Sequence, residues 1–430
     1  MKRGFYTIMS AQFFSSLADQ ALFVVAVELM RTGGSPEWQR AALVPIFAIF
    51  YVVLAPLVGA FADCLPKGKV MFISNAIKVV GCLMMLFGAH PLLAYAIVGL
   101  GAAAYSPAKY GILTELLPAS QLVKANGWIE GLTIASILLG IVLGGALVGQ
   151  ALSGHLIGFG LPGIDTAPEA AIVVLILVYA IAAWFNTRIP HTGVEMRPLR
   201  ANPAQGLARN LVALLPDFWN CNSRLWRDKL GQISLGTTTL FWGAGGNLKY
   251  IVLSWASLAL GYNTTQASAL TGVVTIGLAV GAVVASMRMK LDTATKVIPM
   301  GIGMGLLVMG MIFIDNVWIA VPFLILMGGL GGFLVVPMNA LLQHRGHNLM
   351  GAGRSIAVQN FNEQACILLL GGFYSACTGL GLSAYTAIAA FGGVVAGVMW
   401  IIKRWHESNL RNYPEEVEHL LSIARSDKHH

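Results

Sequence analysis

Three charged residues lie deep inside apolar stretches of the chain: Asp19 in FSSLADQALF, Lys109 in GAAAYSPAKYGIL and Lys249 in FWGAGGNLKYIVL. One carboxylate and two ammonium groups make a bipolar set that suits a zwitterion or a charged amphiphile. The acid would bind an ammonium group, and the bases a phosphate or a carboxylate. Because a charge at mid-bilayer costs roughly 2.5–3.5 kcal/mol on insertion scales, these side chains must face a polar interior rather than lipid.

Each of these charges also has a structural interpretation. Asp19 is either a cation or proton site, or the acceptor of a hydrogen bond from a neighbouring helix. Lys249 follows three glycines, which favour a bent or irregular helix, and is either an anion site or the ion-pair partner of Asp19. Lys109 either points inward, because Pro107 bends its helix, or extends its stem to the membrane surface. Lys78 stands apart from any polar cluster, and we interpret it as structural or surface-seeking.

A second polar set opens a later apolar run, SIAVQNFNEQACILLL. Gln359 and Glu363 are spaced i,i+4 and share one helical face, while Asn360 and Gln364 share an adjacent face. So many amides would be costly against lipid. We therefore expect this face to line a binding cavity together with Asn339, although structural hydrogen bonding between helices is the alternative.

The composition explains why such charges stand out. Of 430 residues, 57% are hydrophobic and 11% are charged, against roughly 25% charged residues in soluble domains, and the mean hydropathy is +0.72. The chain is therefore predicted to be a multi-pass membrane protein. Its five cysteines form no CxxC or Cys/His set, so we expect no metal and no cofactor. The net charge of +8 indicates membrane orientation rather than nucleic-acid binding.

Apolar runs of about 20 residues predict an all-α integral membrane protein with twelve transmembrane helices. The predicted spans are 5–31, 40–63, 69–89, 91–117, 127–153, 168–189, 230–259, 265–288, 295–315, 317–342, 353–379 and 381–403. The polar segment 190–229 separates six spans from six. We therefore predict an N-terminal bundle (1–189), a linker (190–229), a C-terminal bundle (230–403) and a tail (404–430) that contains a short helix.

Basic residues mark one set of helix ends and thereby orient the chain. That set and the linker carry Lys2, Arg3, Lys67, Lys69, Lys124, Arg197, Arg200, Arg209, Arg224, Arg227, Lys229, Arg288, Lys290, Lys296, Arg345, Arg354, Lys403 and Arg404, whereas the opposite ends carry Arg31 and Arg40. Both termini and the linker are therefore predicted to be cytoplasmic.

The chain repeats itself at an offset of 230 residues. GLGAAAYSPAKYGIL (99–113) aligns without gaps to GLGGFLVVPMNALLQ (329–343). The same offset places Lys109 opposite Asn339 and Asp19 opposite Lys249. Two six-helix halves with parallel topology, related by a pseudo-two-fold axis along the membrane normal, are typical of the major facilitator fold.

GAFADCLPKGK (59–69) resembles the loop signature of that superfamily, with Pro66 where a glycine is usual. We expect gating or loop anchoring from Asp63, Lys67 and Lys69, and from Asp292 in the second-half counterpart. Glu115, two turns beyond Lys109, is a candidate ligand. Its alternative is an interfacial carboxylate that pairs with a basic neighbour.

Five longer motifs resemble the bacterial lysophospholipid transporters: GAAAYSPAKYGIL, LVKANG, FWGAG, GGFLVVPMNALLQHRG and MGAGRSIAVQN. The resemblance covers all twelve spans. It implies transport of lysophosphatidylethanolamine and related lysophospholipids to the inner leaflet of the bacterial cytoplasmic membrane, where a cytoplasmic acyltransferase/acyl-carrier-protein synthetase re-acylates them. It also implies that the family's charged positions fall on Asp19, Lys109, Glu115 and Lys249, the last replacing an arginine of relatives. We expect a monomer surrounded by membrane lipids.

Two other functions compete with this one. A proton-coupled exporter of amphiphilic drugs or metabolites would use Asp19 as its protonation site, but Ile141 stands where such antiporters usually carry a proline. A membrane-bound acyltransferase would need an HxxxxD signature, which none of the nine histidines provides. We therefore expect a transporter and not an enzyme.

Overall fold

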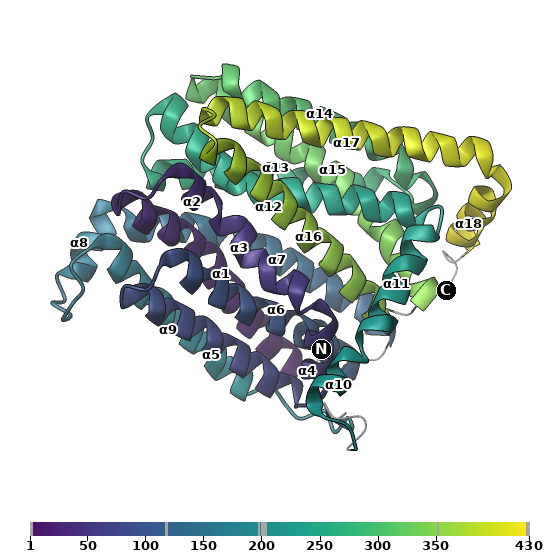
Figure 1. The fold of residues 1–430 in the computed structure, drawn as a ribbon, viewed down its shortest axis with the longest axis horizontal. Helices are drawn as coiled ribbons and strands as arrows, with labels where there is room; N and C mark the ends of the chain where they lie inside the picture. The colour runs from purple at the N-terminus through teal and green to yellow at the C-terminus, as the bar shows by residue number, and fades with distance from the viewer. Residues whose placement is uncertain (1–2, 117–118, 197, 199–203, 351, 427–430) are drawn as a thin grey trace. The chain divides into compact units, whose positions relative to one another are not determined.

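The structure is a computed structural model that describes residues 3–116, 119–196, 198, 204–350 and 352–426. Within these ranges every regular element is a helix (Figure 1). The side chains of Lys2, Arg3, Lys124, Arg197 and Arg200, which belong to the basic set, lie outside the described part.

Helices occupy all twelve predicted spans. The first half contains α1 (Arg3–Thr32), α2 (Glu37–Ala41), α3 (Leu43–Val53), α4 (Ala55–Asp63), α5 (Lys67–Leu86), α6 (Pro91–Leu116), α7 (Ala119–Val148), α8 (Gln150–Ile157) and α9 (Ala167–Thr187). The linker holds α10 (Leu207–Val212) and α11 (Leu215–Arg227). The second half contains α12 (Gly231–Leu260), α13 (Thr264–Arg288), η1 (Leu291–Val297), α14 (Ile298–Gly310), η2 (Met311–Phe313), α15 (Val317–Met350), α16 (Ala352–Gly379), α17 (Ala384–Asn412) and α18 (Pro414–Ser426).

Among the described residues, nine helices are long and apolar enough to cross a membrane. α3 and α4 pass the same test only as a pair, and this pair bends by 64° at Leu54. Pro56 follows in the first turn of α4, and its ring cannot continue the α3 hydrogen-bond ladder. The predicted span 40–63 is therefore two helices rather than one.

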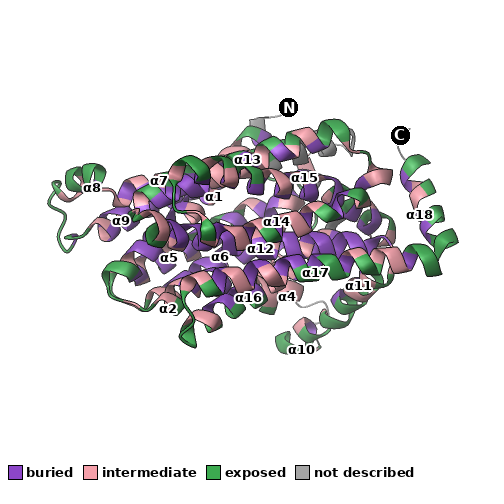
Figure 2. Ribbon diagram, turned by 90° about the horizontal axis from the view of Figure 1, so that it is seen from above, coloured by how far each residue is buried: buried purple, intermediate pink, exposed green. Residues whose placement is uncertain are grey.

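The remaining two predicted spans, α12 and α16, are long but more polar. α12 is buried along most of its length, as Figure 2 shows. It continues without a break past its glycines, so the expected irregularity before Lys249 is wrong. Two of these glycines serve packing instead: Gly243 lies against Cys366 of α16, and Gly246 against Ile367.

Local sequence signals explain several helix ends. Thr166 and Glu169 form a capping box at the start of α9, and the Glu169 carboxylate accepts the Thr166 N–H at 3.0 Å. Ser383 caps α17 by accepting the Thr386 N–H at 3.2 Å. Gly261 ends α12 with φ +64°, a left-handed conformation that glycine adopts at little cost.

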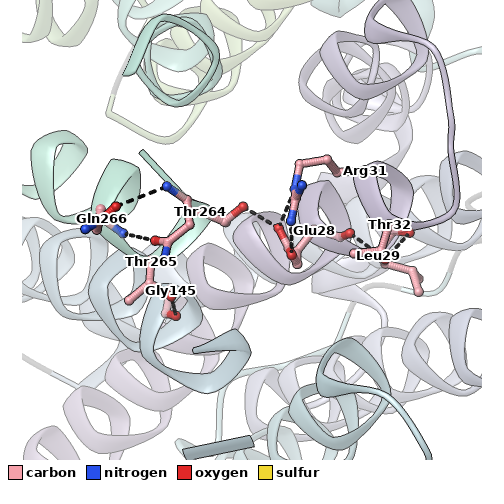
Figure 3. Close-up of polar contacts among 9 residues, drawn as sticks. Glu28, Leu29, Arg31, Thr32, Gly145, Thr264, Thr265 and Gln266 are labelled. Carbon is pink, nitrogen blue, oxygen red and sulfur yellow. Dashed lines mark hydrogen bonds and ion pairs between the residues drawn. The ribbon is translucent and has the colours of Figure 1, made fainter. Parts of the chain in front are cut away.

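The chain forms two compact units. The first comprises Met1–Leu215 with Tyr262–Gly272, and the second comprises Pro216–Gly261 with Val273–His430. The first turns of α13 thus belong to the first unit. There Thr264 donates a hydrogen bond to the buried Glu28 carboxylate, which also forms a bidentate pair with Arg31, and Thr265 donates to the Gly145 carbonyl oxygen at 2.6 Å (Figure 3).

Glycine contacts repeat at the sequence offset of 230. In the first unit a methyl group at Gly99 of α6 would overlap the Phe47 carbonyl oxygen of α3. In the second unit a methyl group at Gly329 of α15 would lie 3.7 Å from the Gly277 carbonyl oxygen of α13. Gly99 and Gly329 are 230 positions apart, and so are Phe47 and Gly277. The repeat therefore preserves a contact between helices as well as a sequence motif.

A second pair of contacts follows the same rule. A Cβ at Gly101 would lie 2.7 Å from the Ser74 carbonyl oxygen of α5, and one at Gly331 would lie 3.3 Å from the Met304 sulfur of α14. Each half therefore uses its GLG motif to seat one helix between two others.

Gly99→Ala tests whether this contact carries stability. Because the added methyl group would overlap a backbone carbonyl, we expect a loss of about 1–3 kcal/mol, read as a lower thermal unfolding midpoint in detergent. Gly131→Ala on α7 is the matched control, because nothing lies within 4 Å of its Cβ position. An unchanged midpoint for Gly99→Ala would show that the helices can move apart freely.

Candidate functional site

Asp19 of α1 is held by side chains from two other helices of the first unit. Lys78 Nζ of α5 donates to Asp19 Oδ2 at 2.8 Å, and the Tyr179 hydroxyl of α9 donates to Asp19 Oδ1 at 2.6 Å. The exposed fraction of the Asp19 side chain is 16%, whereas that of Lys78 is 2%. Asp19 is therefore the accessible end of a buried ion pair.

Lys78 is thus a participant in the polar interior, and the prediction that it stands apart from any polar cluster is wrong. Its ammonium group also donates to Ser15 Oγ at 2.9 Å and lies 5.1 Å and 5.6 Å from the ring centroids of Tyr105 and Tyr179. A sequence signal existed: Ser15 and Asp19 are spaced i,i+4, so both face one neighbouring helix.

The polar chain continues beyond Lys78. The Ser15 hydroxyl donates to Asn75 Oδ1 at 2.7 Å, and Asn75 Nδ2 donates to Asn186 Oδ1 at 2.6 Å. These three side chains are buried. A single hydrogen-bonded series therefore runs from Asp19 through Lys78, Ser15 and Asn75 to Asn186, and it connects α1, α5 and α9.

Lys109 of α6 is buried, with an exposed fraction of 9%. Its ammonium group lies 4.4 Å from the ring centroid of Tyr110, a distance at which a cation interacts with an aromatic face. Protein atoms cover most of the Lys109 side chain. α6 continues as a helix through Pro107.

Lys67 at the start of α5 forms a charged cluster with the end of α4 and the end of α6. Its ammonium group lies 2.7 Å from Asp63 Oδ1 and 3.5 Å from Glu115 Oε1, and it donates to the Ala62 carbonyl oxygen at 2.8 Å. Thr192 donates to Glu115 Oε2 at 2.7 Å. Glu115 is therefore an ion-pairing carboxylate, which is the alternative raised by the sequence.

A cavity of about 580 Å³ opens beside this cluster, within the first unit. Its wall contains Asp63, Lys67, Lys69, Glu115, Asn186, His191, Thr192 and Glu195. Lys69 is exposed, unlike the buried Lys67. Because Asn186 also ends the polar series from Asp19, that series reaches the cavity wall.

In the second unit the predicted amide cluster is assembled. Gln359 Nε2 of α16 donates to Asn339 Oδ1 of α15 at 2.5 Å and to Glu363 Oε1 at 2.9 Å. Gln359 and Glu363 are buried, while Asn360 is half-buried. Lys249 of α12 is also half-buried in this unit.

Asn362, which the sequence interpretation left out, is built into the packing of the second unit. It accepts the Trp226 Nε1–H at 3.1 Å and donates to Asn222 Oδ1 at 2.8 Å. Both partners lie on α11, within the predicted linker. This amide therefore fastens the linker helix to α16.

Arg345 of α15 has a partner that the sequence did not indicate. Its Nε and Nη2 atoms donate to the two carboxylate oxygens of Asp228 at 3.1 Å and 2.6 Å. Asp228 also accepts the Gly231 N–H at 2.7 Å. The repeat places Arg345 opposite Glu115, so charges of opposite sign occupy equivalent positions, and each is paired with a residue outside the repeat relation, Asp228 or Lys67.

Asp292, the fourth predicted gating residue, lies in η1 and contacts the tail. Arg425 of α18 approaches it to 3.5 Å. The Glu418 carboxylate, 2.6 Å from Arg425, raises the pKa of that guanidinium. Asp292 is thus in contact with the predicted tail helix. The described residues contain no group of three or more His, Cys, Asp or Glu side chains that could hold a metal ion.

Comparison with known proteins agrees with this architecture. Residues 8–369 match the family model of the Major Facilitator Superfamily. The chain is 40% identical over 383 residues to the lysophospholipid transporter LplT of Yersinia enterocolitica serotype O:8 / biotype 1B, covering 89% of each protein. It is 38% identical over 408 residues to the transporter of the same name from Escherichia coli O1:K1 / APEC, covering 94% of this chain and 97% of the relative.

Solved structures show the same fold at low sequence identity. A bacterial homologue of the human lysosomal transporter Spinster, inward-facing and unoccupied, has a TM-score of 0.62 at 17% identity, with 99% of this chain and 96% of that chain covered. A mutant of the nucleoside transporter NupG has a TM-score of 0.66 at 13% identity, with 94% of this chain and 100% of that chain covered. The predicted major facilitator fold and the resemblance to lysophospholipid transporters are both confirmed.

Arg345→Ala tests the buried pair of the second unit. It would leave Asp228 buried without its counter-ion, so we expect a loss of about 3–5 kcal/mol of unfolding free energy, read from denaturation in detergent. Arg354→Ala is the control, because the Arg354–Asp217 pair is 3.6 Å long and more than half exposed on both sides, and such pairs contribute about 0–1 kcal/mol. Equal effects would contradict the structural role of Arg345.

Proposed function

The chain belongs to the Major Facilitator Superfamily and to the family of its lysophospholipid-transporter relatives, and from this premise we propose that it moves lysophospholipids to the inner leaflet of the bacterial cytoplasmic membrane by alternating access. It is a multi-pass membrane protein and a transporter, not an enzyme. The observation that carries the proposal is the 38–40% identity to those relatives over 89–94% of this chain.

The chemistry of a lysophospholipid head group suits the side chains of the first unit. Lysophosphatidylethanolamine offers an ammonium group, which the partly exposed carboxylate of Asp19 can accept as a charge-assisted hydrogen bond. Its phosphate is matched by the ammonium group of Lys109. Both side chains lie in the protein interior, where low dielectric strengthens such contacts.

The second unit offers its own candidate ligands. Lys249 can bind phosphate, though as a point charge and without the bidentate geometry of an arginine. Asn339 of α15 and the residues Gln359 and Glu363 of α16 present amide and carboxylate groups in one hydrogen-bonded cluster, with Asn360 next to Gln359 in the chain. These groups suit head-group hydroxyls and amines.

The acyl chain sets a separate requirement. Each methylene group transferred from lipid to water costs about 0.8 kcal/mol, so exposing an ordinary chain would cost roughly 10 kcal/mol or more. The chain must therefore remain in lipid or against an apolar surface while the head group crosses. A lateral opening to the bilayer meets this requirement.

The charged loop cluster is assigned to gating rather than to ligand binding. Lys67 joins Asp63 and Glu115 at the ends of three helices, so breaking these contacts would free α4, α5 and α6 to move against one another. Lys69 and Asp292 complete the gating set. Support comes from the ion pairs themselves, which suit a contact made in one state and broken in another.

Further features complete the proposal. The termini and the linker lie on the cytoplasmic side, and the chain works as a monomer among membrane lipids. The domain boundaries at 189, 230 and 403 separate two transport bundles. A cytoplasmic acyltransferase/acyl-carrier-protein synthetase consumes the product, because a lysophospholipid in the inner leaflet needs a second acyl chain to become a bilayer lipid.

Uptake of labelled lysophosphatidylethanolamine into spheroplasts tests the proposal. Asp19→Asn removes a charged acceptor worth about 1.5–3 kcal/mol, so we expect uptake to fall about tenfold or more at equal membrane abundance. Asp165→Asn, an exposed acid before α9, should leave uptake unchanged. Normal uptake by Asp19→Asn would refute the assigned role. Uptake that follows an imposed proton gradient and ignores lysolipid competitors would favour the proton-coupled exporter.

A further inference from the structure

The function proposed above assigns no role to Lys78. This residue is nevertheless among the most buried charged residues that the structure describes, with 1% of its surface exposed. We propose that Lys78 is a positioning residue for the head-group site: it keeps the Asp19 carboxylate ionised and, with Tyr179, fixes its orientation. This role rests on the proposed function, because it gives Asp19 the charge that a head-group ammonium recognises.

Of the two ion-pair partners, a ligand can reach Asp19 but not Lys78. The Lys78 ammonium group is enclosed by Asp19, Ser15 and the rings of Tyr105 and Tyr179. Asp19, by contrast, keeps part of its side chain exposed. A ligand therefore meets the carboxylate and not the lysine, and Lys78 acts only through Asp19.

Lys78 compensates the negative charge of the Asp19 carboxylate. A carboxylate removed from water neutralises itself by taking up a proton unless an opposite charge compensates it. Lys78 supplies that charge at 2.8 Å. Each Asp19 oxygen accepts one hydrogen bond, from Lys78 or from Tyr179, and a carboxylate oxygen can accept a second. The charge of the carboxylate is therefore compensated at close range, and its oxygens can still accept a further donor.

Hydrogen bonds among Ser15, Asn75 and Asn186 in turn hold Lys78 in place. The Ser15 hydroxyl hydrogen is committed to Asn75 Oδ1, and Asn75 Nδ2 is committed to Asn186 Oδ1. The Ser15 oxygen therefore presents its lone pairs to the Lys78 ammonium group. Because these donors and acceptors have fixed directions, the Lys78 ammonium group is held in one orientation. Ser15 Oγ is one of its acceptors, and the Asp19 carboxylate is the other.

The internal repeat supports a role tied to Asp19 rather than to the fold. At the offset of 230, Lys78 corresponds to Val308, which is buried in α14, while Asp19 corresponds to Lys249. The first half, which carries the acid Asp19, thus has the base Lys78. The second half, which carries the base Lys249, has the apolar Val308 at the position equivalent to Lys78.

Infrared difference spectroscopy and pH-dependent uptake together test this role. Among the described residues, the ionisable groups in electrostatic reach of Asp19 include Lys78 and Cys82 of α5, Tyr51 of α3, Tyr95 and Tyr105 of α6, and Tyr179 of α9. In Lys78→Met the uncompensated Asp19 should take up a proton at neutral pH. A carboxylic-acid carbonyl band should then appear that is absent from the wild type and from the double variant Asp19→Asn/Lys78→Met.

Uptake should follow the protonation. For Lys78→Met we expect lysophosphatidylethanolamine uptake to fall about tenfold at neutral pH and to recover as rising pH ionises Asp19. Lys78→Arg, which retains the positive charge, should show neither the acid band nor the altered pH profile. A merely structural lysine would lower uptake at every pH alike and would produce no acid band.

The outcomes separate this inference from the proposed function. If the wild type takes up no lysophospholipid, the proposed function fails, while the infrared result still decides the role of Lys78. Absence of the acid band in folded Lys78→Met would overturn the inference. Should Lys78→Met fail to fold, the spectrum of wild type minus Asp19→Asn decides: a carboxylate signal at neutral pH supports the role, and a carboxylic-acid signal overturns it.

Discussion

Charge inside an apolar layer must be compensated by the protein, because lipid offers neither counter-ions nor hydrogen-bond partners. Three carboxylates with little exposed surface, one in the middle of a helix and two near helix ends, have their charge compensated in three ways. Asp19 binds Lys78 from another helix, Asp228 binds Arg345 from a helix far along the chain, and Glu28 binds Arg31 one turn away on its own helix. Each pair lies within a single compact unit, so each unit balances these charges internally.

The reversed pairs at Glu115 and Arg345 show how the duplicated halves diverged. The repeat preserved the helix contacts made by Gly99 and Gly329, although a methyl group would overlap a backbone atom at Gly99 and would only touch one, at 3.7 Å, at Gly329. It did not preserve the sign of the charge at the end of the same helix. The position of this helix contact was thus kept in both halves, while each half formed its own ion pair, Glu115 with Lys67 and Arg345 with Asp228.

The helix positions could be predicted from sequence because a long apolar run is a local property of the chain. The break between α3 and α4 was not predicted from the length of the apolar run, although Pro56 is the local sequence signal that marks it. The amide cluster around Gln359 was predicted because its residues lie one turn apart. The partner of Lys78 was not, because Asp19 is 59 positions away and the repeat offset directs attention to Lys249 instead.

Contacts made by the predicted linker (190–229) could not be predicted from the sequence either. Asp228 lies outside both repeated segments, so alignment of the halves could not reveal it as the counter-ion of Arg345. The contacts of Asn222 and Trp226, on the preceding helix α11, with Asn362 were missed for the same reason. Tertiary hydrogen bonds formed by a segment without a repeat partner leave no periodic trace in the sequence.

The polarity of α12 and α16 bears on how the chain enters its membrane. These two helices pack against each other, and Asn247 of α12 donates to the Ile367 carbonyl oxygen of α16 at 3.1 Å. α12 leaves the ribosome before α13, α14 and α15, and its eventual neighbour follows only afterwards. The polar groups of α12 therefore gain these partners only when synthesis of the second unit is nearly complete.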